Sequence, residues 1–545
     1  MGLTGRSTIF LGHLPDGSPM ESSEEDTIGV IGPPGCGKTT AVLIPTLLWW
    51  DGPVVATSTK SELVRETSDA RLLHAREEGG DVYVYDPFRT DPRYPSIHWT
   101  PTSGCENPST CNLRVSAMAA AAAKGTEAQA YWESSVQRVL LPLFHAAAVT
   151  KSPFARVATW LASGTKAREV LDILASPESS APEAWAEGLR EILDSDPATR
   201  DPILSVARTT MQATQDPVVL ESCSTNDLDV LQFLLTSSTL YVVGPSHKQK
   251  AIAPLISGLV DSIAQEATDL AAKYETGRLK HPLLLALDEV ANIAPLDSLQ
   301  SLISEGRGRR ILTLWATQDL AQLRDRYGPE KAKAIIGATK ALVLFGGVKN
   351  EDTLKELSVL GGEELITIHG VSNTREGLFG WKPTRSETEQ YRMVVNEGDL
   401  RQLPDKHAAL FYANKPVQLA YMPGAYENPM FANRCGDSLY LGHVRGGSPA
   451  TPASPPDTRI PIPPTPKKLA AGFTPSPAYE QSQARSSIPR ALTAEFLPGE
   501  ITPRRKPVAV FVPNRNSQGK RKQRPPKAEF IPSDPARVKP EDKTP

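Results

Sequence analysis

Residues 32–39 constrain the fold more than any other segment of this chain. They read GPPGCGKT and fit G-x-x-x-x-G-K-[ST], the Walker A pattern of a phosphate loop (P-loop). An apolar run at residues 27–31 precedes them, and residues 40–48 follow as an expected helix. An ordinary Gly/Pro turn at a strand–helix junction is the alternative, and the complete pattern disfavours it. The segment therefore predicts a nucleotide-binding α/β domain.

The loop positions have distinct physical roles. Glycines let the backbone curl so that successive N–H groups point at phosphate oxygens, and the following helix adds the positive end of its dipole. Lys38 is expected to reach the β and γ phosphates, and Thr39 to ligate Mg²⁺. The predicted nucleotide-binding residues are Gly32, Pro33, Pro34, Gly35, Cys36, Gly37, Lys38, Thr39 and Thr40.

A second motif lies at residues 283–289, where an apolar strand ends in Asp288 and Glu289. Adjacent carboxylates after a buried strand are costly unless they have partners or a function. In the Walker B role, Asp288 would hold the magnesium shell and Glu289 would polarise the attacking water. Many strands end in Asp-Glu at a turn, so the motif gains its weight from the phosphate loop. Together they predict an ATPase that uses ATP and Mg²⁺.

Gln318 follows a third apolar strand, residues 311–316. Ligands of α/β folds bind at the carboxyl ends of parallel strands. Gln318 is therefore a catalytic candidate beside Lys38 and Glu289, either sensing the γ-phosphate or orienting the water. A glutamine that caps a helix or closes a turn fits the residue type equally well.

A basic cluster, SEGRGRR at residues 304–310, leads into the same strand. A loop before a strand lies at the sheet edge opposite the nucleotide of its own subunit. These arginines are expected either to contact DNA or a neighbouring subunit, or to place favourable charge at a helix C-terminus.

Short apolar runs alternate with helical stretches over the first 446 residues. Most runs are continuous, which is typical of strands covered on both faces in a largely parallel sheet. The pattern predicts a doubly wound α/β fold. The expected strands are residues 27–31, 54–57, 82–85, 240–243, 283–287, 311–316, 341–345 and 408–412.

Residues 112–235 interrupt the alternation with an alanine-rich stretch and then apolar residues at helical spacing, such as Trp132, Val136 and Val139. We expect an all-helical domain inserted into the sheet domain, and the separation of 250 positions between Lys38 and Asp288 supports it. The predicted limits are 1–111 and 236–446 for the two parts of the nucleotide-binding domain, 112–235 for the insertion and 447–545 for a tail.

The charge is divided between body and tail. Residues 447–545 carry 17 Lys and Arg against 8 Asp and Glu, about +9, and the whole chain is −3, which leaves about −12 for residues 1–446. DNA contacts in the body must therefore be local or arise from assembled copies. The Pro-rich basic tail is expected to be disordered. Apolar islands at residues 508–512 and 528–531 are alternative docking motifs.

Five cysteines without a secretory signal indicate a reduced, intracellular protein. Cys105, Cys111 and His98 lack a standard zinc spacing and a fourth ligand, so no zinc site is expected. No run reaches the ~18–20 apolar residues of a membrane span. A cytoplasmic location is expected, and a peripheral position at the inner face of the cell membrane stays open.

In their order, these motifs resemble the conjugative coupling proteins of type IV secretion, the TraG/TraD class, in the FtsK/HerA-like branch of RecA-fold P-loop ATPases. The resemblance covers about residues 25–425. It rests on residues 31–40, 41–50, 54–62 (VVATSTKSE), 84–87 (VYDP), 98–101 (HWTP), 131–143 (YWESSVQRVLLPL), 285–295 (LALDEVANIAP), 304–318 and 401–404 (RQLP).

The resemblance implies a RecA-like homo-hexamer around single- or double-stranded DNA. It implies ATP-driven delivery of a relaxase-bound single strand to type IV secretion channel components. It also implies an arginine supplied by the adjacent subunit, for which Arg375, Arg385 and Arg392 are candidates. Family members usually begin with membrane-spanning helices, whereas no span precedes residue 32. Membrane association is therefore expected through a partner or a missing N-terminal anchor.

Two other functions stay open from the sequence. One is a recruitment platform that delivers relaxase or other secreted substrates to the channel, with ATP as a switch. The other is an ATPase that threads proteins through a secretion system without pumping DNA.

Overall fold

The computed structural model describes residues 6–122, 129–376 and 380–446 of the 545-residue chain. Its strands are β1 (Phe10–His13), β2 (Pro19–Glu21), β3 (Ile28–Ile31), β4 (Val54–Ser58), β5 (Val82–Tyr85), β6 (Thr239–Val243), β7 (Leu283–Leu287), β8 (Ile311–Thr317), β9 (Ala341–Phe345), β10 (Glu363–Glu376), β11 (Gly380–Met393), β12 (His407–Tyr412) and β13 (Gln418–Tyr421).

Within the described residues, one sheet has the order β2-β1-β13-β12-β9-β3-β8-β7-β4-β6-β5. The strands from β9 to β5 run parallel and form what we call the parallel part. The strands β12, β13, β1 and β2 continue the sheet in antiparallel pairing and form the antiparallel extension. All eight strands expected from the sequence are confirmed, with ends shifted by at most one residue.

The parallel part separates two apolar cores. In β7, Leu283, Leu285 and Leu287 belong to one buried cluster, and Leu284 and Ala286 belong to the other. Helices supply the opposite wall of each core. The second cluster includes residues of α1 (Ile44–Trp49), α2 (Glu62–Glu77) and α17 (Ser438–Val444), and the first includes residues of α11 (Gln249–Lys273), α12 (Leu299–Glu305), α13 (Leu320–Tyr327) and α14 (Pro329–Ala338).

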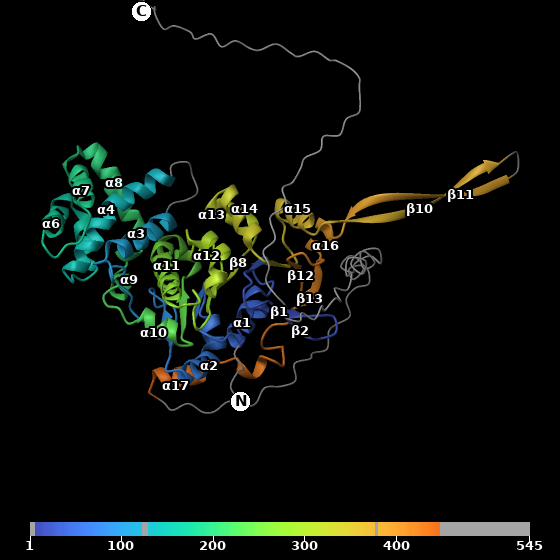
Figure 1. Ribbon diagram of the computed structural model, residues 1–545, viewed down its shortest axis with the longest axis horizontal. Coiled ribbons are helices and arrows are strands. Elements are labelled where there is room, and N and C mark those ends of the chain that lie inside the picture. Colours follow the sequence, from blue (N-terminus) through green and yellow to red (C-terminus); the bar gives the residue numbers. More distant parts are fainter. Residues whose placement is uncertain (1–5, 123–128, 377–379, 447–545) are drawn as a thin grey trace, which may run out of the picture. The chain divides into compact units, whose positions relative to one another are not determined.

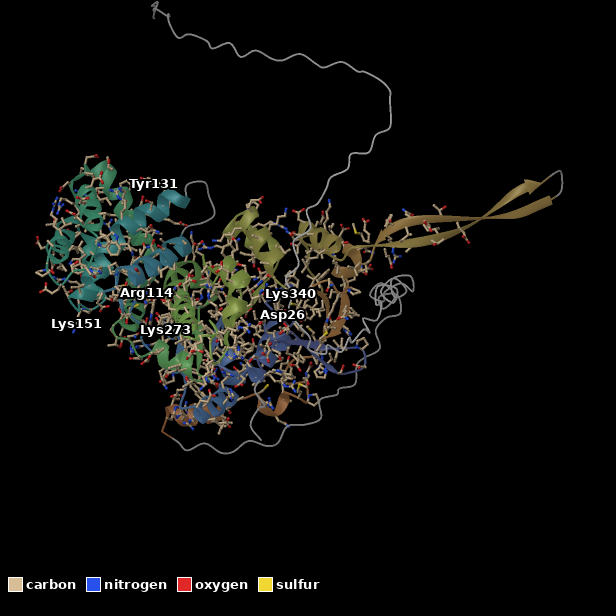
Figure 2. The ribbon with its side chains drawn as sticks, viewed as in Figure 1. Asp26, Arg114, Tyr131, Lys151, Lys273 and Lys340 are labelled. Carbon is tan, nitrogen blue, oxygen red and sulfur yellow. The ribbon has the colours of Figure 1, made fainter. Side chains whose placement is uncertain are left out.

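The strands start together at one edge of the sheet. Figure 2 labels Asp26 and Lys340 close together, just before β3 and β9, and the Lys340 amide donates to the Thr27 carbonyl at 3.1 Å. The opposite edge, where parallel strands end, carries the phosphate loop after β3. This arrangement confirms the α/β fold with a mostly parallel sheet.

Between β5 and β6 the described residues contain no strand and, besides the 3₁₀ turn Gln212–Gln215, their regular elements are α-helices (Figure 1). They are α3 (Pro108–Ala122), α4 (Gln129–Val149), α5 (Ala155–Ala162), α6 (Gly164–Leu174), α7 (Glu183–Asp194), α8 (Pro197–Thr210), α9 (Pro217–Ser222) and α10 (Val230–Leu235). Helix α3 packs along α11, and the buried side chains of the region continue into the first apolar cluster. The domain limits at 112 and 235 therefore stay predictions.

Some elements were not expected from the sequence. In the antiparallel extension the sequence did not predict β1, β2 or β13. Strand β1 pairs with β13 through His13 and Tyr421. A long hairpin, β10 with β11, follows α15 (Glu351–Leu360) and precedes α16 (Glu397–Arg401) (Figure 1). The helix after the phosphate loop starts as a π-helical segment, Lys38–Leu43, and continues as α1, which has Pro45 in its first turn.

The predicted tail, residues 447–545, and its islands at 508–512 and 528–531 lie outside the described residues. No helix among those that are described is both long and apolar enough to cross a bilayer.

Candidate nucleotide site

The backbone of the phosphate loop requires its glycines. Gly35 and Gly37 have φ of +79° and +107°, in the left-handed region that side chains disfavour. A Cβ on Gly32 would lie 2.5 Å from Cys36 Sγ and 2.9 Å from Phe345 Cβ, so only glycine fits there. Of the other predicted residues, Pro33, Pro34 and Cys36 lie in the turn between β3 and the helix, and Thr40 lies in the first turn of that helix.

Lys38 is buried inside the loop, with 6 % of its surface exposed. Its Nζ donates to the carbonyl oxygens of Gly32 at 2.6 Å and Pro33 at 3.2 Å, and lies 4.0 Å from Glu289 Oε1. A buried ammonium needs such partners to offset desolvation. Its position within the arc of amides suits a group that neutralises phosphate charge.

Asp288 and Thr39 meet across the end of β8. Thr39 Oγ1 donates to Asp288 Oδ2 at 3.2 Å, although the two residues lie 249 positions apart. Burial, followed by the charge of Glu289, raises the pKa of Asp288 to about 6. Asp288 Oδ1 is buried and has no hydrogen-bond partner among the described residues. A buried carboxylate oxygen without a hydrogen-bond partner is available to ligate a cation that prefers oxygen ligands.

A strained turn directs Glu289 into the site. Glu289 has φ +51°, which is uncommon for a non-glycine residue and persists where the surroundings enforce it. The Val290 amide donates to the Ala316 carbonyl at 3.0 Å and holds the turn against β8. Gln318 Nε2 lies 3.3 Å from both Glu289 carboxylate oxygens. The side chain of Gln318 thus contacts Glu289, and Asp319 is the N-cap of α13.

Two supporting residues were missed from the sequence. Gln322 Oε1 accepts from Thr317 Oγ1 at 2.9 Å and from the Gln318 amide at 3.2 Å, which fixes the end of β8. Asn292 Nδ2 donates to Glu289 Oε2 at 3.4 Å. An Asp three residues before a Gln, as in Asp319 and Gln322, is a helix-start signal that would have placed Gln322. No local signal indicated Asn292.

The basic cluster lies at the start of β8, at the edge opposite the phosphate loop. Arg309 Nη1 is 3.5 Å from Glu305 Oε2, and Arg310 Nη1 donates to the Lys280 carbonyl at 3.0 Å. Arg309 thus pairs with a residue of the preceding helix and Arg310 with a loop carbonyl, while Arg307 is exposed, and both expected roles of the cluster stay predictions.

The candidates for an arginine acting on a neighbouring subunit lie on the hairpin. Arg375 pairs in register with Trp381, and Arg385 with Val371, but their side chains lie outside the described part of the structure. Arg392 Nη2 is 3.4 Å from Glu364 Oε1, across the base of the hairpin. The structure does not bring Arg392 to the phosphate loop of its own chain.

The residues fit a magnesium nucleotide. Hydroxyl and carboxylate oxygens are the ligands that Mg²⁺ prefers, and Thr39 and Asp288 supply one of each within hydrogen-bonding distance. The phosphate loop has no side-chain atom at Gly32, Gly35 or Gly37, so its backbone amides are not covered at these positions. Sequence reasoning predicted the main components of the site, and the structure brings Lys38, Thr39, Asp288, Glu289 and Gln318 together.

Comparison with known proteins gives a consistent result. Residues 10–434 match the family profile described as "Type IV secretory system Conjugative DNA transfer". The conjugal transfer protein TraG of Escherichia coli is 24% identical over 448 residues, covering 74% of this chain and 67% of that protein. Protein VirD4 of Rhizobium radiobacter is 23% identical over 424 residues, covering 74% and 58%. The chain thus spans from about half to two thirds of the length of the curated relatives it matches.

Solved structures share the fold. The bacterial conjugative coupling protein TrwBdeltaN70 aligns with a TM-score of 0.54 at 18% identity, covering 74% of this chain and 86% of that one. The plasmid coupling protein TrwB in complex with ADP and Mg²⁺ gives a TM-score of 0.54 at 18% identity, covering 76% and 89%. The family match spans well over half of the sequence, so this chain belongs to the family of conjugative DNA transfer proteins of type IV secretory systems, and TraG and VirD4 are among the proteins similar to it.

Proposed function

We propose that this protein hydrolyses ATP and uses the free energy to move DNA, delivering relaxase-bound single-stranded DNA to a type IV secretion channel. The observation that carries the proposal is the convergence of two distant segments. Thr39 Oγ1 lies 3.2 Å from Asp288 Oδ2, and Lys38 Nζ lies 4.0 Å from Glu289 Oε1. Family membership supplies the context of conjugative DNA transfer.

Each side chain has a task in this proposal. The amides of residues 32–39 hold the phosphates, and Lys38 neutralises charge that develops between the β and γ phosphates. Thr39 and Asp288 hold Mg²⁺, which would supply charge neutralisation at the phosphate oxygens. Glu289 accepts a proton from the attacking water, and Gln318 orients that water and the Glu289 carboxylate through its amide.

The assembly is part of the same proposal. The body carries about −12 of net charge, so a continuous DNA surface on a single copy is not expected. A ring of identical copies, the proposed hexamer, would gather local basic groups such as Arg307 around one strand. Arg375, Arg385 and Arg392 stay proposed as groups that reach a neighbouring active site.

ATP turnover by the assembled full-length chain tests the proposal. We expect turnover to rise on addition of single-stranded DNA, and both turnover and its stimulation to disappear in Lys38→Ala. Affinity for DNA should fall steeply as salt rises, because phosphate contacts release counterions. An assembled protein that neither binds DNA nor responds to it would contradict DNA pumping, and would favour the protein-threading ATPase suggested by the acidic body.

A further inference from the structure

A cleft of about 640 Å³ opens beside the phosphate loop. The loop and the start of its helix form one wall, including Pro34, Gly35 and Thr40. The other wall comes from the antiparallel extension, through the segment before β12 and the segment after β13. The volume lies within the range of ~300–1,000 Å³ that is usual for small-molecule sites. Lys38 and Asp288 do not line this cleft, so it extends the site beyond the phosphates.

The segment after β13 is bonded directly to the phosphate-loop helix. We call residues 424–428 the strap. The Ala425 amide donates to the Thr40 carbonyl at 2.8 Å, and the amides of Glu427 and Asn428 donate to the Gly424 carbonyl at 2.9 and 3.0 Å. Asn428 is fully buried, with its Nδ2 2.9 Å from His13 Nε2. These bonds fix the position of the strap relative to the loop, independently of any flexible side chain.

The strap presents an aromatic ring to the cleft. Tyr426 lines the cleft and is 59% exposed. Its ring covers Gly424, where a Cβ would lie 3.0 Å from Tyr426 Cζ. An aromatic ring whose position is fixed offers a flat face on which a base can stack.

The cleft as a whole presents more polar than apolar surface. Phe345, Leu403 and Met422 line it and are buried in the protein. At the rim, Lys406 Nζ donates to Glu427 Oε1 at 2.8 Å. A flat ligand with polar edge groups would stack on the ring, and ligand hydroxyls would meet the Lys406–Glu427 pair. These are the properties of a nucleobase and its ribose.

We infer that this cleft binds the nucleoside half of the nucleotide, with the base stacked on Tyr426 and the ribose hydroxyls at Lys406 and Glu427. The inference rests on the proposed function, since it requires the phosphates to lie in the loop. Tyr426 then contributes affinity for the base, and the phosphate contacts of Lys38 are unchanged by it.

Equilibrium binding of two ligands to the full-length protein tests this assignment. One ligand is Mg-ATP, and the other is Mg-tripolyphosphate, which has the phosphates without the nucleoside. Tyr426→Ala should weaken ATP binding by about 5- to 150-fold, the range for loss of one base–aromatic stack, and leave tripolyphosphate binding unchanged. Tyr426→Phe should bind both ligands as the wild type does, because the ring is kept.

Tyr131→Ala is a matched control, because Tyr131 is 68% exposed and lies at the start of α4 in the helical region (Figure 2). It should bind both ligands normally. Melting curves of all variants should coincide with that of the wild type, which shows that the fold is retained. Equal wild-type affinities for ATP and tripolyphosphate, or normal ATP binding by Tyr426→Ala, would overturn the nucleoside cleft while leaving the proposed ATPase intact. A wild-type protein that binds neither ligand would overturn both.

Discussion

The parallel part and the antiparallel extension of the sheet meet at β9, yet they contribute different things to the site. The parallel part supplies the side chains that contact one another around the phosphate position: Lys38, Thr39, Asp288, Glu289 and Gln318. The extension supplies the strap and the charged rim of the neighbouring cleft. We therefore expect turnover to depend on the parallel part, and nucleotide affinity to depend on both parts.

Lys38→Ala should have the largest effect, because it should lower both ATP turnover and nucleotide affinity. Its Nζ is buried among loop carbonyls, and a charge-assisted contact contributes ~1.5–3 kcal/mol, so we expect nucleotide affinity to drop about 100-fold and turnover to vanish. Titration with fluorescent ATP measures the affinity. Undiminished ATP binding by a folded variant would show that the loop does not hold the phosphates.

Glu289→Gln should lower ATP turnover without lowering nucleotide affinity. The side chain keeps its size but cannot accept a proton, so turnover should fall about 10²- to 10⁴-fold while ATP affinity stays near that of the wild type. Single-turnover hydrolysis with binding measured in parallel is the appropriate assay. Wild-type turnover would assign the proton-accepting role to another group.

Gln318→Ala should lower turnover by about tenfold, because it removes the amide that lies 3.3 Å from both Glu289 oxygens. The matched control is Gln265→Ala on α11, where the amide bonds to Asp269 at 2.9 Å, and it should leave turnover unchanged. A loss of nucleotide affinity instead of turnover would show that Gln318 acts in nucleotide binding. It would also contradict the assignment of turnover to the side chains of the parallel part.

The smallest effect is expected in the extension, as a dependence of stability on pH. His13 is fully buried between the Gly17 carbonyl and the Asn428 amide. Burial lowers the pKa of His13 despite its bond to the Gly17 carbonyl. The folded state therefore binds fewer protons than the unfolded state, so the stability that His13 contributes is lost as pH falls below the ordinary histidine pKa of ~6.5.

Melting temperatures of the wild type and His13→Gln, compared from pH 8 to pH 5, test this expectation. The variant cannot titrate at this position, so the advantage of the wild type should shrink as the pH falls. A difference that stays constant over this range would show that His13 does not ionise on unfolding.

The contrast between the two parts also explains what could be predicted. In β7 and β8 nearly every residue is apolar and buried on both faces, and polar residues begin where each strand ends, so the strands and the candidate site could both be predicted from the sequence. In the extension, Pro19–Glu21 and Gln418–Tyr421 are short and only partly buried. The partners His13 and Tyr421 lie about 400 positions apart, and no local pattern specifies such a pairing.

Other features depend on context that a linear pattern does not contain. The left-handed backbone of Glu289 follows from its turn against Ala316, and the amide of Asn292 reaches Glu289 only because of that turn. No sequence motif indicated Tyr426. It lies beside the phosphate loop because the neighbouring Ala425 amide donates to the Thr40 carbonyl. The strands β10 and β11 of the hairpin are 14 residues each and contain many polar residues, so the apolar pattern did not predict them.

The pairing of β1 with β13 has a consequence for biosynthesis. A ribosome adds ~5–20 residues per second, so the strap emerges roughly 20–80 s after the phosphate loop. During that interval β1 can pair with β2 but lacks β13, and Thr40 lacks the amide of Ala425. A nascent chain therefore acquires the second wall of the cleft only when translation has passed residue 428.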